Sequence, residues 1–166
     1  MKVTFLMPIL TSSSGARRMD DVPPPSPLGR RDYRIMDFLR RQAIDNEGAS
    51  RAKMAAAVVL KGKIISTGRN QYKTHPIATE YGKNRDAIFL HAETHAIVNS
   101  LNHLDKDDLR KATLYIYRVK HPDNNKNSYI NGLAKPCKGC MRAIAEFDFK
   151  RVVYTTDNPE EFAVLQ

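Results

Sequence analysis

Pro136-Cys137-Lys138-Gly139-Cys140 contains both cysteines of this 166-residue chain, and His91-Ala92-Glu93 lies upstream of it. Two cysteines and a histidine are residue types that bind zinc, and three protein ligands leave one position of a tetrahedral ion open. Structural zinc sites are normally closed by four protein ligands, whereas catalytic sites keep a position for water. Glu93 is close enough to His91 to exchange protons with that water without binding the metal. The two motifs together predict a catalytic zinc site.

Each motif alone allows other interpretations. A C-x-x-C pair is also typical of a redox dithiol or of half a zinc knuckle. The redox interpretation gives no role to His91 or Glu93. A zinc knuckle needs a second pair of ligands at short spacing, and His103 and His121 are lone histidines. A catalytic zinc site is the interpretation that uses the histidine, the glutamate and both cysteines.

The first motif continues to His95, so two histidines stand four residues apart on one face of the expected helix. Zinc metalloproteases carry H-E-x-x-H, in which the glutamate directly follows the first histidine. Alanine occupies that position here, which argues against a protease. We expect His95 to be a buried or hydrogen-bonded helix residue beside the site.

The composition indicates a globular protein: 42% of the residues are hydrophobic. No apolar run approaches the ~20 residues that a membrane-spanning helix needs. The apolar start, Val3 to Leu10, is short, contains Pro8 and lacks a convincing signal-peptide cleavage site. Cysteines confined to one motif favour a reducing compartment over a disulfide scaffold. We therefore expect a cytoplasmic protein without membrane contact.

Basic residues outnumber acidic ones by 27 to 18, a net charge of +9. This balance favours anionic partners, either nucleotide phosphates or a nucleic-acid backbone. Lys135, Lys138 and Arg142 surround the cysteine motif, so part of the charge should lie near the metal. Basic residues that only keep the protein soluble are the alternative. Charge alone does not separate a mononucleotide from a polymer.

The chain divides at about residue 30 into an N-terminal extension, residues 1–29, and one domain, residues 30–166. The extension is basic and rich in serine and proline, with Pro23-Pro24-Pro25-Ser26-Pro27, and is expected to be extended or polyproline-like. The expected elements of the domain, from periodicity and turn residues, are a helix over 32–44, strands over 54–60 and 64–68 joined by a tight turn, a loop over 69–90, a helix opening at His91, a strand over 113–119, a polar segment over 120–132, a helix over 140–147 and a strand over 151–156.

These motifs and their order resemble the cytidine/deoxycytidylate deaminase superfamily, whose signature is H-x-E followed by P-C-x-x-C. The resemblance covers about residues 50–156 and is greatest to deoxycytidylate (dCMP) deaminases. Its matching segments are Arg51–Leu60, Ile64–Asn70, His91–Ile97 and Arg151–Tyr154. It implies an α/β protein, a three-layer α/β/α fold with a mixed central sheet.

The resemblance also implies roles, residue by residue. His91, Cys137 and Cys140 become the ligands of Zn2+ and Glu93 the proton shuttle. Asn70 corresponds to an asparagine that contacts the substrate sugar, and the backbone of Ala92 to a contact with the base carbonyl. The implied reaction is hydrolysis of dCMP to dUMP and ammonia, by a homo-oligomer with a regulatory nucleotide. Apart from the resemblance, Lys73 and His75 follow Asn70 closely, and we expect them to hold the phosphate; a solvated loop whose path Pro76 fixes is the alternative.

A polynucleotide deaminase acting on cytosine or adenine in RNA or single-stranded DNA is the alternative. Such a protein should show stacking aromatics along a basic groove. The chain has no tryptophan, its seven tyrosines are scattered, and Lys135 precedes the Pro-Cys motif where those enzymes carry Trp-Ser or Glu. Nucleic acid is therefore the less favoured partner. A non-enzymatic zinc-binding module is the remaining option, and Glu93 argues against it.

Several features depart from the pattern of dCMP deaminases. His95 replaces a common asparagine, and Arg69 and Gln71 flank Asn70 in place of tyrosine and glycine. Residues 120–132 are an insertion, and only ten residues follow Thr156, few for a final helix and strand. Residues 2–10 could add a strand instead, in the same sheet or on a neighbouring subunit.

Overall fold

The computed structural model describes residues 3–6, 28–49, 52–82, 84 and 89–166. The elements, in chain order, are β1 (Val3–Leu6), α1 (Arg30–Ile44), β2 (Lys53–Leu60), β3 (Lys63–Arg69), β4 (Gln71–Thr74), α2 (Pro76–Glu80), β5 (Phe89–Leu90), α3 (Ala92–Ser100), α4 (Lys106–Leu109), β6 (Thr113–Lys120), β7 (Ile130–Gly132), α5 (Lys138–Glu146), β8 (Arg151–Thr155) and β9 (Phe162–Leu165).

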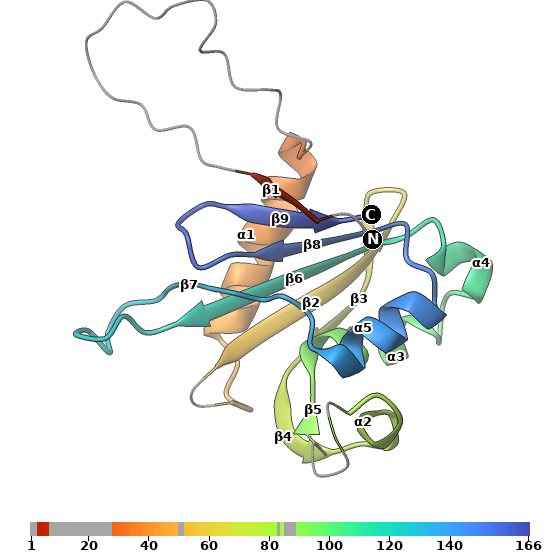
Figure 1. Ribbon diagram of the computed structural model, residues 1–166, viewed down its shortest axis with the longest axis horizontal. Coiled ribbons are helices and arrows are strands. Elements are labelled where there is room, and N and C mark those ends of the chain that lie inside the picture. Colours follow the sequence, from red (N-terminus) through yellow and green to blue (C-terminus); the bar gives the residue numbers. More distant parts are fainter. Residues whose placement is uncertain (1–2, 7–27, 50–51, 83, 85–88) are drawn as a thin grey trace, which may run out of the picture.

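Seven strands form one mixed sheet in the order β1-β9-β8-β6-β2-β3, with β7 paired to β6 (Figure 1). β6 and β8 are parallel, and the other pairs in this sheet are antiparallel. A parallel pair needs a crossover connection, which contains α5 here. β4 and β5 form a separate two-stranded ribbon. No helix within the described ranges is long and apolar enough to cross a membrane.

Strand alternation divides the apolar residues of the sheet between two cores. In β2, Ala56 and Val58 pack with α3 and α5, whereas Ala55, Ala57 and Val59 pack with α1 on the opposite face. β6 and β8 alternate in the same way. A strand that is covered on both faces has a continuous run of apolar residues in its sequence, as β2 has. The expected three-layer α/β/α fold with a mixed central sheet is therefore confirmed.

Most of the longer elements were predicted within two residues of their ends. The expected hairpin is present: Leu60 pairs with Lys63 across a turn in which Lys61 and Gly62 both have positive φ. The prediction of a loop over 69–90 is wrong, because β4, α2 and β5 lie there. β7 forms inside the polar insertion, and α4 was not predicted. All of these additional elements have five residues or fewer, too short for periodicity to reveal.

Both ends of the chain meet in the sheet. β9 forms within the ten residues after Thr156 and pairs with β8, and β1 pairs with β9 from residue Val3 to Leu6. The additional N-terminal strand therefore lies in the chain's own sheet. Residues 11–27, expected to be extended, lie outside the described residues, and the division of the chain at residue 30 stays a prediction.

Asp32 connects α1 to the sheet beneath it. Its carboxylate accepts the backbone N–H of Gly29 at 2.8 Å, as a cap of the helix, and the Tyr115 hydroxyl. Arg151 of β8 completes the group with an ion pair of 2.6 Å, and the two side chains are only 12% and 21% exposed. One acid therefore fixes the start of α1 against β6 and β8.

We predict that Asp32→Ala destabilises the fold by about 3 kcal/mol, because it leaves the guanidinium of Arg151 without its ion-pair partner in a largely buried position. Urea unfolding measures the change. Asp37→Ala is the matched control on the same helix: its pair with Arg41 is exposed and contributes little. Equal losses for the two variants would contradict the anchoring role of Asp32.

Candidate active site

Two helices begin at the predicted metal ligands. His91 is the N-cap of α3, and Cys137 is the N-cap of α5, where its sulfur accepts the backbone N–H of Cys140 at 3.5 Å. Helix N-termini carry unsatisfied N–H groups and a partial positive charge. Both features favour a thiolate at Cys137 over a neutral thiol.

The three predicted ligands meet at spacings that fit zinc. Nδ1 of His91 lies 3.3 Å from Sγ of Cys140 and 3.5 Å from Sγ of Cys137, and all three ligand atoms lie within 4.8 Å of one another. Tetrahedral zinc, with bonds of about 2.0–2.1 Å to nitrogen and 2.3 Å to sulfur, separates such ligands by about 3.5 Å. In the described part of the chain, no second group of three or more such side chains meets these criteria.

The three ligand side chains shift one another's pKa values. A hydrogen bond from Cys140, aided by His91, lowers the pKa of the Cys137 thiol to about 3. The same contact with Cys137, together with burial and the nearby Glu93, raises the pKa of Cys140. Cys137 also raises the pKa of His91. A divalent cation must displace the protons that remain, so zinc binding should strengthen as pH rises.

Glu93, in the first turn of α3, is a buried acid beside these ligands. It is 2% exposed, and burial raises the pKa of its carboxyl group, although the charge of His91 opposes the shift. Its Oε2 atom is buried and has no hydrogen-bond partner among the described residues. An unsatisfied buried oxygen costs about 1–3 kcal/mol. The position suits a proton-transfer group, whose pKa is best placed near the working pH.

Two glycines allow close backbone packing against the first turns of α3 and α5. A Cβ at Gly68 of β3 would lie 2.4 Å from the carbonyl oxygen of Ala92 in α3. A Cβ at Gly139 of α5 would lie 1.9 Å from the carbonyl oxygen of Tyr81. Such separations exclude any side chain at either position. Neither glycine was predicted from the sequence to belong to the site.

Asn70 joins β3 to β4, and β5, the partner of β4, leads into the metal ligand His91. Gln71 of β4 pairs with Leu90 of β5 in an antiparallel register, so Asn70 and His91 adjoin the ribbon at the same end. On the other side of Asn70, the N–H of Arg69 donates to Nδ1 of His95 at 3.2 Å. The expectation that His95 is a hydrogen-bonded residue beside the site is confirmed.

The side chain of Asn70 is held as a hydrogen-bond donor. Its Oδ1 accepts from the backbone N–H of Met54 at 2.8 Å and from Nδ2 of Asn46 at 2.9 Å. Its Nδ2 donates one hydrogen to the carbonyl of Ala52 at 2.6 Å, which leaves one N–H. Asn46 is 2% exposed and is fixed in turn by the N–H of Gly48. Asn46, 24 residues away in sequence, was missed because no local pattern marks it.

The other predicted substrate-binding residues lie on α3, on β4 and at the start of α2. Ala92 is the first residue of α3, fully buried, and its N–H belongs to the helix start. Lys73 is exposed on β4, and His75 is the N-cap of α2, with Nδ1 accepting the N–H of Ile77 at 3.2 Å. His75 also lines a small hollow of about 320 Å³.

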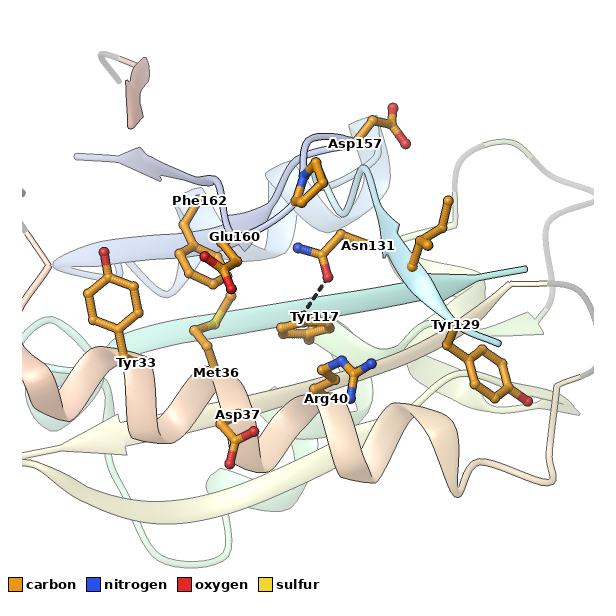
Figure 2. A pocket seen from close by; sticks show the side chains of 12 residues that line it. Tyr33, Met36, Asp37, Arg40, Tyr117, Tyr129, Asn131, Asp157, Glu160 and Phe162 are labelled. Carbon is orange, nitrogen blue, oxygen red and sulfur yellow. Dashed lines mark hydrogen bonds between the residues drawn. The ribbon is translucent and has the colours of Figure 1, made fainter. Parts of the chain in front are cut away.

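A larger hollow, of about 680 Å³, lies on the opposite face of the sheet (Figure 2). It is lined by one stripe of α1 together with β6, β7 and the turn between β8 and β9. Tyr117, on its floor, donates a hydrogen bond of 2.6 Å to Oδ1 of Asn131. None of the predicted metal, catalytic or substrate-binding residues lines this hollow, so size alone would have misplaced the site.

A known protein family matches most of the chain. The cytidine and deoxycytidylate deaminase zinc-binding region matches residues 30–156. The dCMP deaminase of cyanophage S-TIM5 in complex with dCMP and dUMP is 23% identical, with a TM-score of 0.49, over 74% of this chain and 78% of that chain. Its apo form gives 22% identity and a TM-score of 0.44 over 74% and 83%. No curated protein sequence matches the chain.

We predict one zinc ion per chain, held by the three-residue cluster. His91→Ala and Cys140→Ala should each lose most of the metal, because two remaining protein ligands do not form a stable tetrahedral site. His95→Ala, one turn further along α3, is the control and should keep it. Metal analysis of the purified proteins measures the content. Zinc at the wild-type level in His91→Ala would exclude this ligand set.

Proposed function

Since this chain belongs to the cytidine and deoxycytidylate deaminase family and is therefore a hydrolytic deaminase with zinc as its cofactor, we propose that its substrate is dCMP. Water adds at C4 of the cytosine ring and the amino group leaves as ammonia, which gives dUMP. The observation that carries the proposal is the buried, unsatisfied carboxylate of Glu93 next to three ligands with zinc spacing.

Glu93 moves the protons of this reaction. When bound by His91, Cys137 and Cys140, zinc supplies a Lewis acid that makes hydroxide available near neutral pH. Glu93 accepts one proton from the attacking water and delivers it to N3 of the ring. It then takes the second proton of that water from the C4 hydroxyl and passes it to the amino group, which leaves as ammonia as the C4 carbonyl forms. The raised pKa of its carboxyl group supports both the acid and the base role.

The residues around the metal position the nucleotide. The N–H of Ala92, at the positive end of α3, donates to the carbonyl oxygen of the base. Asn70 donates its remaining N–H to a hydroxyl oxygen of the sugar, because its own oxygen is already occupied by Asn46 and Met54. Lys73 holds the phosphate, with Nε2 of His75 as a second donor, since Nδ1 already caps α2.

A nucleotide rather than a nucleoside is favoured by charge. The chain carries a net charge of +9, and exposed lysines 73, 135 and 138 come from segments that lead into or out of the site. A phosphate gains charge-assisted hydrogen bonds from such groups. A homo-oligomer and a regulatory nucleotide remain expectations that these residues do not address.

We predict that Glu93→Gln removes deamination while zinc content and fold are kept. The amide has nearly the same shape but transfers no proton, and loss of a general acid–base group costs about 10²–10⁴-fold in rate. Ammonia release from a panel of free nucleotides and nucleosides is the measurement. Near-normal turnover by this variant would show that another group moves the protons.

We predict that Asn70→Asp lowers kcat/KM for dCMP by at least about 5- to 150-fold, since a carboxylate has no N–H for the sugar hydroxyl and also loses the bond to the carbonyl of Ala52. Lys73→Ala should lower kcat/KM for dCMP by about 10- to 150-fold and leave any deoxycytidine activity unchanged, because the nucleoside has no phosphate. Lys63→Ala, on the distant end of β3, is a control with the same loss of charge. Equal effects of Lys73→Ala on nucleotide and nucleoside would contradict a phosphate contact.

A further inference from the structure

The larger hollow, on the face of the sheet that α1 covers, has the size and lining of a second binding site. Its volume of about 680 Å³ falls within the range of about 300–1,000 Å³ that small-molecule sites occupy. Three elements, α1, β6 and β9, each contribute an aromatic ring to it: Tyr33, Tyr117 and Phe162 (Figure 2). The Phe162 centroid lies 5.7 Å from that of Tyr33 and 6.4 Å from that of Tyr117, with the ring planes inclined by 70° and 60°. A ligand in the hollow therefore meets rings of different orientation.

The charges that line the hollow differ in sign from the charge of the whole chain. The chain carries a net charge of +9. The lining contains three acids and one base: Asp37, Asp157, Glu160 and Arg40. Asp37 is paired with Arg41 at 2.5 Å, and Asp157 with Lys120 at 2.6 Å. Among the described residues, Glu160 pairs with no base. The hollow therefore offers a free carboxylate in a protein that is otherwise basic.

Glu160 lies in a turn with a strained backbone. Its φ is +57°, in the left-handed region that favours glycine. The next residue, Glu161, is only 4% exposed, and its carboxylate accepts hydrogen bonds from the hydroxyl of Thr156, at 3.0 Å, and from Nδ2 of Asn158. Strained residues persist where their surroundings fix them, and they are concentrated at functional sites. The buried acid thus holds the backbone from which Glu160 reaches the hollow.

Aromatic rings together with a free carboxylate suit an organic cation. The face of an aromatic ring attracts ammonium and guanidinium groups, and a cluster of rings is a common receptor for alkylated ammonium compounds. An anion would meet three acids, and a neutral ligand would make no use of Glu160. The hollow is also larger than an ammonium group alone, so its ligand needs an apolar part to cover residues such as Met36 and Pro159.

We propose that this hollow binds a small organic ammonium compound with an apolar body. The ammonium group contacts the carboxylate of Glu160 and the rings of Tyr33 and Phe162, and the apolar body packs against Met36 and Tyr117. The three predicted zinc ligands and the predicted substrate-binding residues do not line the hollow, so the site is separate from the metal cluster. The proposal does not depend on the proposed function.

The test titrates the zinc-loaded full chain, with isotope-labelled tyrosine and phenylalanine rings, with three probes of similar size: phenethylammonium, phenylethanol and phenylacetate. NMR shifts of the ring signals give a Kd for each probe. Phenethylammonium should bind about 2- to 30-fold more tightly than phenylethanol, because only the cation is attracted to the ring faces. Phenylacetate should bind most weakly. The shifted signals should include those of Tyr33, Tyr117 and Phe162.

Two variants test the contacts. Tyr33→Leu removes one ring but keeps apolar volume, and it should raise the Kd for phenethylammonium by about 2- to 30-fold. Glu160→Gln removes the charge at nearly constant shape and should raise this Kd by about 1.5- to 5-fold. Both side chains are exposed, so neither change disturbs the core. Tyr72→Leu and Asp107→Asn replace an exposed ring and an exposed acid outside the hollow, and as matched controls they should leave the Kd unchanged.

Equal binding of phenethylammonium and phenylethanol would overturn the proposal, since the hollow would then be an apolar cavity that does not recognise charge. Tighter binding of phenylacetate would contradict it too, because Arg40 would then decide which charge is accepted. Absence of binding by the cation, or a Kd that neither Tyr33→Leu nor Glu160→Gln changes, would have the same consequence. Deamination is not measured, so a failure of the proposed function leaves the result of this test unaffected.

Discussion

The proposed metal site depends on the N-termini of α3 and α5 lying close together. α3 starts at His91 and α5 at Cys137, and their N-termini bring a nitrogen and two sulfurs within 4.8 Å of one another. Each helix is placed by backbone that passes too close for a side chain, at Gly68 and Gly139. Positive helix ends stabilise thiolate charge, and bound zinc would complete its neutralisation. The sheet packs against both helices and supports their N-termini.

The groups that would contact a substrate lie where edge strand β3 leaves the sheet. β3 leaves the sheet at Asn70 and continues into β4, whose partner β5 runs directly into His91. One short ribbon therefore joins a metal ligand and an oriented amide. Asn46 links the end of α1 to this ribbon through Asn70. Positions far apart in sequence are thereby fixed within one hydrogen-bonded unit, which is how a small chain can preorganise a site.

The ligands and the main strands could be predicted because each leaves a local pattern. H-A-E and P-C-x-x-C are fixed by metal chemistry, and Met54–Leu60 is apolar because both of its faces are covered. The ribbon was missed because β4 and β5 are short and mostly exposed, so no alternation marks them. The bond between Asn46 and Asn70 spans 24 residues, and only the folded chain reveals it.

X-ray absorption at the zinc edge tests the shared ligand set most directly. The account predicts a zinc-loaded protein with two sulfur neighbours at about 2.3 Å and lighter neighbours at about 2.0–2.1 Å. Cys140→Ala should leave a single sulfur neighbour in whatever metal remains bound. A spectrum with no sulfur, or with four protein ligands and no change on addition of a nucleotide, would contradict a catalytic zinc site built from His91, Cys137 and Cys140.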